Sequence, residues 1–202
     1  MRLGRFLLTF VFLSSPAVAH ADTTLPEPVT NEELSVLIEA ADALYQSGKY
    51  VEAYTAYRNE LAPRGDAFGQ YLTGYMLTHG QGVEKDPITG AAWMKLASDQ
   101  GYLPLIRAKK KARKVLDGVA QQRSDDTYRE LKQTYGDCAL LAGRIEYLEE
   151  HVETITGSRI PENVSRVTVL YQFGPDLGFA QRQMRLREVL KAQRRAYRRE
   201  CR

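Results

Sequence analysis

The sequence predicts an all-α fold, built from antiparallel helix pairs and followed by a helical C-terminal extension. Apolar residues recur at the helical period through most of the chain. Glycine and proline fall mainly between these periodic segments, and runs of β-branched residues are few. Residues 166–173 alternate weakly, as a strand would, but no second strand is apparent to pair with them. We therefore expect irregular or helical packing there.

The clearest helix pair lies in residues 66–101. Its first helix has helical spacing from Ala67 onward and stops at the Gly-Gln-Gly sequence of residues 80–82. Two glycines around one residue permit a tight chain reversal, because they adopt backbone conformations that a side chain would forbid. Asp86 and Pro87 then suit the N-cap and first position of a second helix, which ends at Gly101.

This segment resembles the Sel1-like repeat, a branch of the tetratricopeptide superfamily. Leu77 and Gly90 depart from the family pattern, which has tyrosine and alanine at these positions. The resemblance covers about a fifth of the chain. It implies a short right-handed α-solenoid and a protein-binding scaffold rather than a catalyst. The matching residues are Ala67, Gln70, Tyr71, Gly74, Gly80, Gly82, Val83, Asp86, Trp93, Ala97 and Gly101.

A second unit is expected upstream, at residues 31–63. Residues 31–46 are amphipathic, and Thr30 with Glu33 has the spacing of a capping box. Ala41 precedes Gly74 by 33 residues, close to the tetratricopeptide period of about 34. The alternative is an unrelated helical hairpin. The pattern that resembles a tetratricopeptide unit consists of Gly48, Tyr50, Ala53 and Tyr57.

The resemblance also implies a binding surface, because the first helix of each tetratricopeptide unit lines the concave side. Aromatic side chains with a polar group suit a groove that receives an extended peptide or a helix. Alternatively, these side chains complete the packing between neighbouring helices. With Gly74 as the small packing position, the inward positions are Phe68, Tyr71, Tyr75 and Thr78, with Ser35, Ile38, Asp42 and Tyr45 upstream.

The first 21 residues have the features of a signal peptide. Arg2 and Arg5 precede an apolar run at residues 6–13, and Ala19 and Ala21 form a small-x-small cleavage site. The run is too short to cross a bilayer, which requires about 20 residues. An uncleaved anchor is the alternative. We expect a periplasmic or secreted protein, cleaved near Ala21.

Export gives the two cysteines a structural interpretation. Cys138 and Cys201 are the only cysteines, and an oxidising compartment permits a bridge between them. In the chain-entropy model, closing so long a loop contributes roughly 4 kcal/mol. A free thiol at Cys201 is the alternative. No Cys-x-x-Cys motif indicates redox catalysis.

Beyond the signal peptide we expect a repeat domain at residues 30–116 and an extension at 117–202. Because each helical unit covers its apolar face only against a neighbour, about three units are normally required. Only two are recognisable, so the C-terminal half should cap the stack, add degenerate units or be replaced by self-association. The candidate helices in this half lie at residues 103–116, 124–135, 138–154 and 178–199.

Charge is divided between the halves of the chain. Residues 22–101 contain 5 basic and 12 acidic residues, whereas residues 102–202 contain 21 basic and 13 acidic ones. Basic clusters lie at 107–114 and in the final helix at 178–200. The latter is a surface for anionic lipid or acidic glycan, or an ordinary solvated helix face. Its basic residues are Arg182, Arg185, Lys191, Arg194, Arg195, Arg198 and Arg199.

No pattern of catalytic or cofactor-binding residues is present in the sequence. After the first 21 residues the histidines are His79 and His151, and neither lies in a metal-binding motif. Nucleophile elbows, phosphate loops and dinucleotide motifs are absent. We expect no enzyme activity, cofactor, metal or nucleic-acid partner. The sequence favours an exported scaffold that binds an unknown envelope protein, with self-association possible; the alternative is an envelope-surface-binding module.

Overall fold

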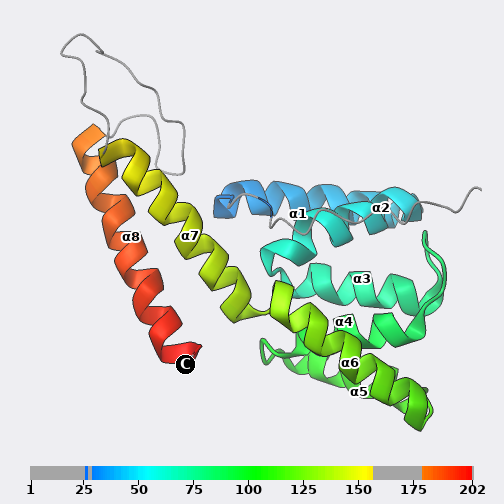
Figure 1. Cartoon of the computed structure of the whole chain (residues 1–202). Coiled ribbons are helices and arrows are strands. Elements are labelled where there is room, and N and C mark those ends of the chain that lie inside the picture. Colours follow the sequence, from blue (N-terminus) through cyan, green and yellow to red (C-terminus); the bar gives the residue numbers. More distant parts are fainter. Residues whose placement is uncertain (1–25, 27–28, 157–178, 202) are drawn as a thin grey trace, which may run out of the picture.

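The computed structural model describes residues 26, 29–156 and 179–201 (Figure 1). Within these ranges the chain is helical and forms no strand, so the predicted all-α fold of tetratricopeptide and Sel1-like type is confirmed. The predicted signal peptide and residues 166–173 lie outside the described residues. The elements are α1 (Asn31–Gln46), α2 (Tyr50–Ala56), a π turn (Tyr57–Leu61), a 3-10 turn (Ala62–Arg64), α3 (Ala67–His79), α4 (Pro87–Ser98), α5 (Leu103–Lys114), α6 (Gly118–Tyr135), α7 (Asp137–Thr156) and α8 (Phe179–Glu200).

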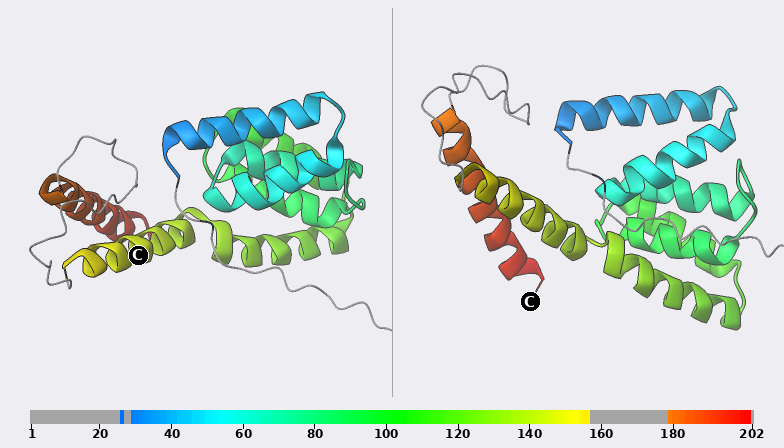
Figure 2. Two further views of the ribbon diagram at one scale, coloured as in Figure 1. Left: turned by 90° about the horizontal axis from the view of Figure 1, so that it is seen from above. Right: turned by 45° about the horizontal axis from the view of Figure 1, so that its top comes forward.

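Helices α1 to α6 form one stack, with α1 and α2 at one end and α5 and α6 at the other (Figure 1). Helices α1, α3 and α5 run in one direction, and each is followed by a helix that returns (Figures 1 and 2). Helices α7 and α8 lie beside this stack as a separate antiparallel pair. The boundary at residue 116 between the repeat domain and the C-terminal extension stays a prediction. Helix α6, which follows this boundary, packs on α4 of the repeat domain.

The helix starts follow the capping residues of the sequence. Thr30 and Glu33 form the predicted capping box, and Asp86 accepts hydrogen bonds from the backbone N–H groups of Ile88 and Thr89. The predicted start of α6 at residue 124 was wrong. The helix begins at Gly118, because the Asp117 side chain accepts a hydrogen bond from the Ala120 N–H and caps the first turn.

Helices α3 and α4 touch through their backbones at two glycines. A Cβ atom added at Gly74 would lie 2.6 Å from the carbonyl oxygen of Gly90, and one added at Gly90 would lie 2.6 Å from that of Gly74. The Cβ of Gly90 would also overlap the hydroxyl of Thr78. This crowding explains why Gly90 replaces the alanine usual in Sel1-like repeats.

The turn between α3 and α4 reaches back to the preceding helix pair. Gly82 has a φ of +70°, and any Cβ there would overlap the carbonyl group of Tyr50 at the start of α2. The Gly-Gln-Gly sequence therefore serves both a local turn and the contact between neighbouring units.

Trp93 of α4 links three parts of the stack. Its side chain is 1% exposed, and its ring centroid lies 5.4 Å from that of Tyr135 in α6. The guanidinium of Arg58, in the π turn, lies 4.9 Å from the Trp93 ring centroid and 5.4 Å from that of Tyr135. The tryptophan of the repeat thus joins the upstream pair to α6.

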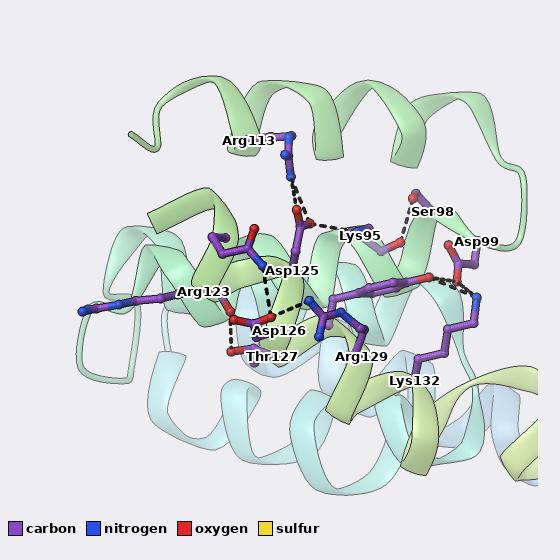
Figure 3. Close-up of polar contacts among 12 residues, drawn as sticks. Lys95, Ser98, Asp99, Arg113, Arg123, Asp125, Asp126, Thr127, Arg129 and Lys132 are labelled. Atoms are coloured by element: carbon purple, nitrogen blue, oxygen red, sulfur yellow. Dashed lines mark hydrogen bonds and ion pairs between the residues drawn. The ribbon is translucent and has the colours of Figure 1, made fainter. Parts of the chain in front are cut away.

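Ion pairs hold α5 and α6 against α4 (Figure 3). Asp125 of α6 lies between Lys95 of α4, at 2.8 Å, and Arg113 of α5, at 2.9 Å. Lys132 of α6 forms a further ion pair of 2.9 Å with Asp99, just after α4. Because α5 contributes few buried side chains, these charged contacts add to a small apolar contact.

The pair of α7 and α8 is closed by the predicted disulfide between Cys138 and Cys201, which is confirmed. The bond joins the first turn of α7 to the residue that follows α8. Leu148 and Leu190 are buried in the pair, and Arg194 forms an ion pair with Glu149. Apart from the disulfide, the pair thus has the ordinary contacts of an antiparallel helical hairpin.

We predict that Gly74→Ala destabilises the protein by about 1–3 kcal/mol, because the added Cβ overpacks the contact with Gly90. The overpacking must exceed a favourable effect, because alanine stabilises a helix interior by about 1 kcal/mol relative to glycine. Gly118→Ala is the matched control, since nothing lies within 4 Å of its Cβ position. Urea unfolding measures both variants. Equal stability of the Gly74→Ala variant and the wild type would contradict the backbone contact.

The ion pairs of Asp125 should make stability depend on pH. Hydrogen bonding to Lys95, followed by that to Arg113, holds the pKa of Asp125 below its ordinary value of 3.8. A carboxyl whose pKa is lowered by folding stabilises the protein above its unfolded pKa, and this contribution is lost as the pH falls through the folded pKa.

We therefore expect Asp125→Asn to lower the free energy of unfolding by about 1 kcal/mol at pH 7, with the difference shrinking below about pH 4. Asp126→Asn is the control, because the contacts that Asp126 makes with Arg129 and Gln122 lie within its own helix and join no other element. Denaturant titrations between pH 7 and pH 3 measure both effects. A difference that does not change with pH would argue against the ion pairs.

Candidate partner-binding face

Tyrosines of α1 and α3 converge beside the turn that follows α3. The hydroxyl of Tyr45 donates a 3.0 Å hydrogen bond to the side-chain oxygen of Gln81, and its ring meets that of Tyr50 edge to face at 5.3 Å. Burial, together with the nearby phenol groups of Tyr75 and Tyr50, raises the pKa of Tyr45. The predicted positions Tyr45 and Tyr75 thus lie in one neighbourhood.

Tyr71 and Tyr75 combine packing with partial exposure. Their ring centroids are 6.1 Å apart, and both side chains pack against a buried cluster that α4 and α5 form from Ala91, Met94 and Ala112. Burial raises the pKa of Tyr71. The alternative given for these residues, that they complete the packing between helices, therefore describes contacts that they make, while both side chains remain partly exposed.

His79 continues this column of rings. Its imidazole stacks on Tyr75 with centroids 4.1 Å apart, and its Nδ1 lies 2.8 Å from the Tyr75 carbonyl oxygen. Because a carbonyl oxygen only accepts, this nitrogen donates the hydrogen bond. The ring is thereby fixed at the end of α3.

An exposed apolar surface lies at the opposite end of α3. Phe68 is 53% exposed and Tyr102 is 52% exposed, with their ring centroids 6.2 Å apart. Leu103 beside them is 66% exposed. We call these three residues the aromatic ridge. Sequence reasoning found Phe68 but missed Tyr102 and Leu103, although Gly101 placed them at the start of the next helix.

The other predicted inward positions lie in varied surroundings. Asp42 accepts a 2.6 Å hydrogen bond from the hydroxyl of Tyr57, and burial followed by this bond raises the pKa of Tyr57. Thr78 donates to the carbonyl oxygen of Gly74, at the contact of α3 with α4. Ile38 is half-buried against the first helix pair, and Ser35 is exposed.

The basic residues of α8 divide into paired and unpaired groups. Arg194 is paired with Glu149, and Arg199 with the adjacent Glu200. Lys191, Arg195 and Arg198 are exposed, with no ion pair among the described residues. The side chains of Arg182 and Arg185 lie outside the described residues.

A cavity of about 430 Å³ lies where α6, α7 and the end of α8 meet. Among the charged residues that line it, Asp99 is joined to Lys132 and Glu200 to Arg199, and Asp137 is the fourth. Its two cysteines, Cys138 and Cys201, are bonded to each other. Across the described ranges, no three His, Cys, Asp or Glu side chains gather closely enough to hold a metal ion. Among the helices of the same residues, none is long and apolar enough to cross a membrane.

Comparison with known protein families identifies the central helix pair. Residues 67–102 match the Sel1 repeat. The matched residues comprise α3, the glycine turn, α4 and the first turn toward α5, in agreement with the predicted unit at 66–101. The repeat suggests a scaffold for protein–protein interaction, and proteins that contain it are generally non-enzymatic. No curated protein and no solved structure shows a significant match to the chain.

Proposed function

We propose that this chain is an exported scaffold that binds another envelope protein through the side of the stack formed by α3 and α5. The Sel1 repeat at residues 67–102 carries the proposal, since such helix pairs build interaction surfaces. The helices of the stack are fixed to one another by backbone contact, a buried tryptophan and ion pairs. Rigid elements of this kind present a binding surface without paying for its ordering.

The aromatic ridge is the part of this surface best suited to anchor a partner. Large apolar side chains that are exposed in the free protein gain the most from burial, and aromatic residues are enriched among binding hot spots. Tyr71 and Tyr75 lie between the ridge and Tyr45 along α3 and supply hydroxyl groups beside it. A segment with one apolar anchor and polar flanks fits this arrangement.

Export is supported by two features of the chain. The positive residues Arg2 and Arg5, the apolar run at 6–13 and the small residues before Asp22 have the order of a signal peptide. The disulfide between Cys138 and Cys201 is compatible with an oxidising compartment, where such bonds persist. An envelope protein is therefore the class of partner we propose.

We expect the double variant Phe68→Ala with Tyr102→Ala to recover at least tenfold less partner from cross-linked envelope material. Truncating an aromatic anchor at the centre of an interface costs about 2 kcal/mol or more. The ridge is a better target than Tyr71 and Tyr75, whose removal would also open the packing against α4. Val119→Ala is the control, because Val119 is 67% exposed in the first turn of α6, outside the aromatic ridge. Wild-type recovery by a folded double variant would exclude the ridge.

Three exposed basic residues of α8 without an ion pair among the described residues favour a second candidate function, the binding of anionic lipid or acidic glycan. Each basic residue near an anionic surface contributes about 1 kcal/mol, so the triple change of Lys191, Arg195 and Arg198 to glutamine should weaken binding about a hundredfold. The control is a second triple variant, in which Arg107, Lys110 and Lys114 of α5 are changed to glutamine, because it removes the same number of positive charges. Co-sedimentation with anionic vesicles and retention on acidic glycan measure both variants. Equal loss from both variants, or no wild-type binding at low salt, would dismiss the candidate.

A further inference from the structure

The two ends of the helix stack have complementary surfaces. At one end the outer side of α1 is exposed, and at the other end the outer side of α5 is exposed (Figure 1). In a helical repeat protein each unit normally covers its neighbour, so an uncovered terminal helix leaves unused contact surface. Both outer sides here include a large apolar residue, with Val36 61% exposed and Leu103 66% exposed.

The outer side of α1 is acidic. Glu32, Val36, Glu39 and Ala43 recur at helical spacing, and all four are exposed. Helix α1 contains four acidic residues and no basic one. Neither Glu32 nor Glu39 has an ion pair among the described residues. The small side chain of Ala43 permits another helix to approach closely.

The outer side of α5 is basic. Leu103, Arg107, Lys110, Lys111 and Lys114 recur at helical spacing on the side opposite the buried Leu105 and Ala112. Helix α5 contains six basic residues and no acidic one. Arg113 pairs with Asp125, whereas the four outward basic residues have no ion pair in the described part of the chain.

The two surfaces also match in spacing. Glu32 and Glu39 are separated by seven residues, as are Arg107 and Lys114, so both pairs span about 10.5 Å along their helices. Helices α1 and α5 run in the same direction within the stack (Figure 1). A second molecule placed in continuation of the stack would therefore bring its α1 beside α5 in a parallel arrangement, with both charge pairs aligned.

We propose that the outer side of α1 in one copy packs on the outer side of α5 in another copy, so that the stack continues from molecule to molecule. The two surfaces lie at opposite ends of the same stack and cannot meet within one molecule. Such a contact is heterologous: it leaves one acidic and one basic end free, and further copies can add to both. This association shares Leu103 with the aromatic ridge, but it does not rest on the envelope partner proposed above.

Sedimentation velocity of the oxidised wild-type chain over a range of concentrations tests the proposal. We expect species larger than the monomer at low salt, and their loss at high salt, because exposed charges are screened. A wild-type chain that remains monomeric at low salt and high concentration would overturn it. So would association that is unchanged between low and high salt.

Two charge-reversed variants identify the surfaces. Glu32→Lys with Glu39→Lys makes both ends basic, and Arg107→Glu with Lys114→Glu makes both ends acidic. Each alone should associate at least about 100-fold more weakly, since like charges placed opposite each other cost several kcal/mol. Mixed in equal amounts, the two variants should associate again, because each supplies the surface that the other lacks. Circular dichroism checks that both remain helical.

A matched control reverses the charge of another exposed basic surface. Lys191→Glu with Arg195→Glu changes α8 by the same amount and should leave association as in the wild type. Loss of association in this control, together with its retention in the α5 variant, would assign the contact to α8 and overturn the proposal. A mixture of the two reversed variants that stays monomeric would overturn it as well.

Discussion

The stack depends on the backbone contact between α3 and α4. At Gly74 and Gly90 neither helix has a Cβ to keep the other away, so each main chain approaches the carbonyl oxygen of its neighbour. This proximity buries the middle of α4, from Gly90 to Met94, and sets Trp93 against the next layer. The small residues at the helix contact therefore determine where the large residue of the repeat is placed.

Packing density falls from this centre toward the ends. Helix α4 is covered on several sides, whereas α5 buries Leu105 and Ala112 and is otherwise held by charged groups such as Arg113. Local stability in proteins follows the density of buried contacts, so the terminal helices should open more easily than the centre. The same gradient leaves the outer surfaces of the stack available for other molecules.

The central pair could be predicted from the sequence because its signals are local. Glycine, an aspartate cap and a following proline each act within a few residues, and the observed bounds of α3 and α4 follow them closely. The start of α6 was missed because the helix opens with Gly118, a residue that disfavours helix, and Val119 beside it is exposed, so only the cap of Asp117 marks the start.

The binding surface was less accessible to sequence reasoning. The repeat period of the sequence predicted that Tyr45, Tyr71 and Tyr75 lie near one another. It did not predict the extent to which α4 and α5 bury Tyr71 and Tyr75. The contact of Tyr102 with Phe68 joins the residue before α5 to the first turn of α3, and such a contact between separate elements is a tertiary property. Likewise, the role of Asp125 depends on Lys95 and Arg113, which belong to two other helices.

The disulfide has a topological consequence for the C-terminal half. The disulfide joins Cys138, in the first turn of α7, to Cys201, which follows α8. The 62 residues between the two cysteines therefore belong to one covalent ring. A single backbone cut inside that ring separates no fragment, since both pieces stay attached through sulfur. The two pieces would therefore stay together after such a cut, and α8 would separate from the rest of the chain only after reduction of the disulfide.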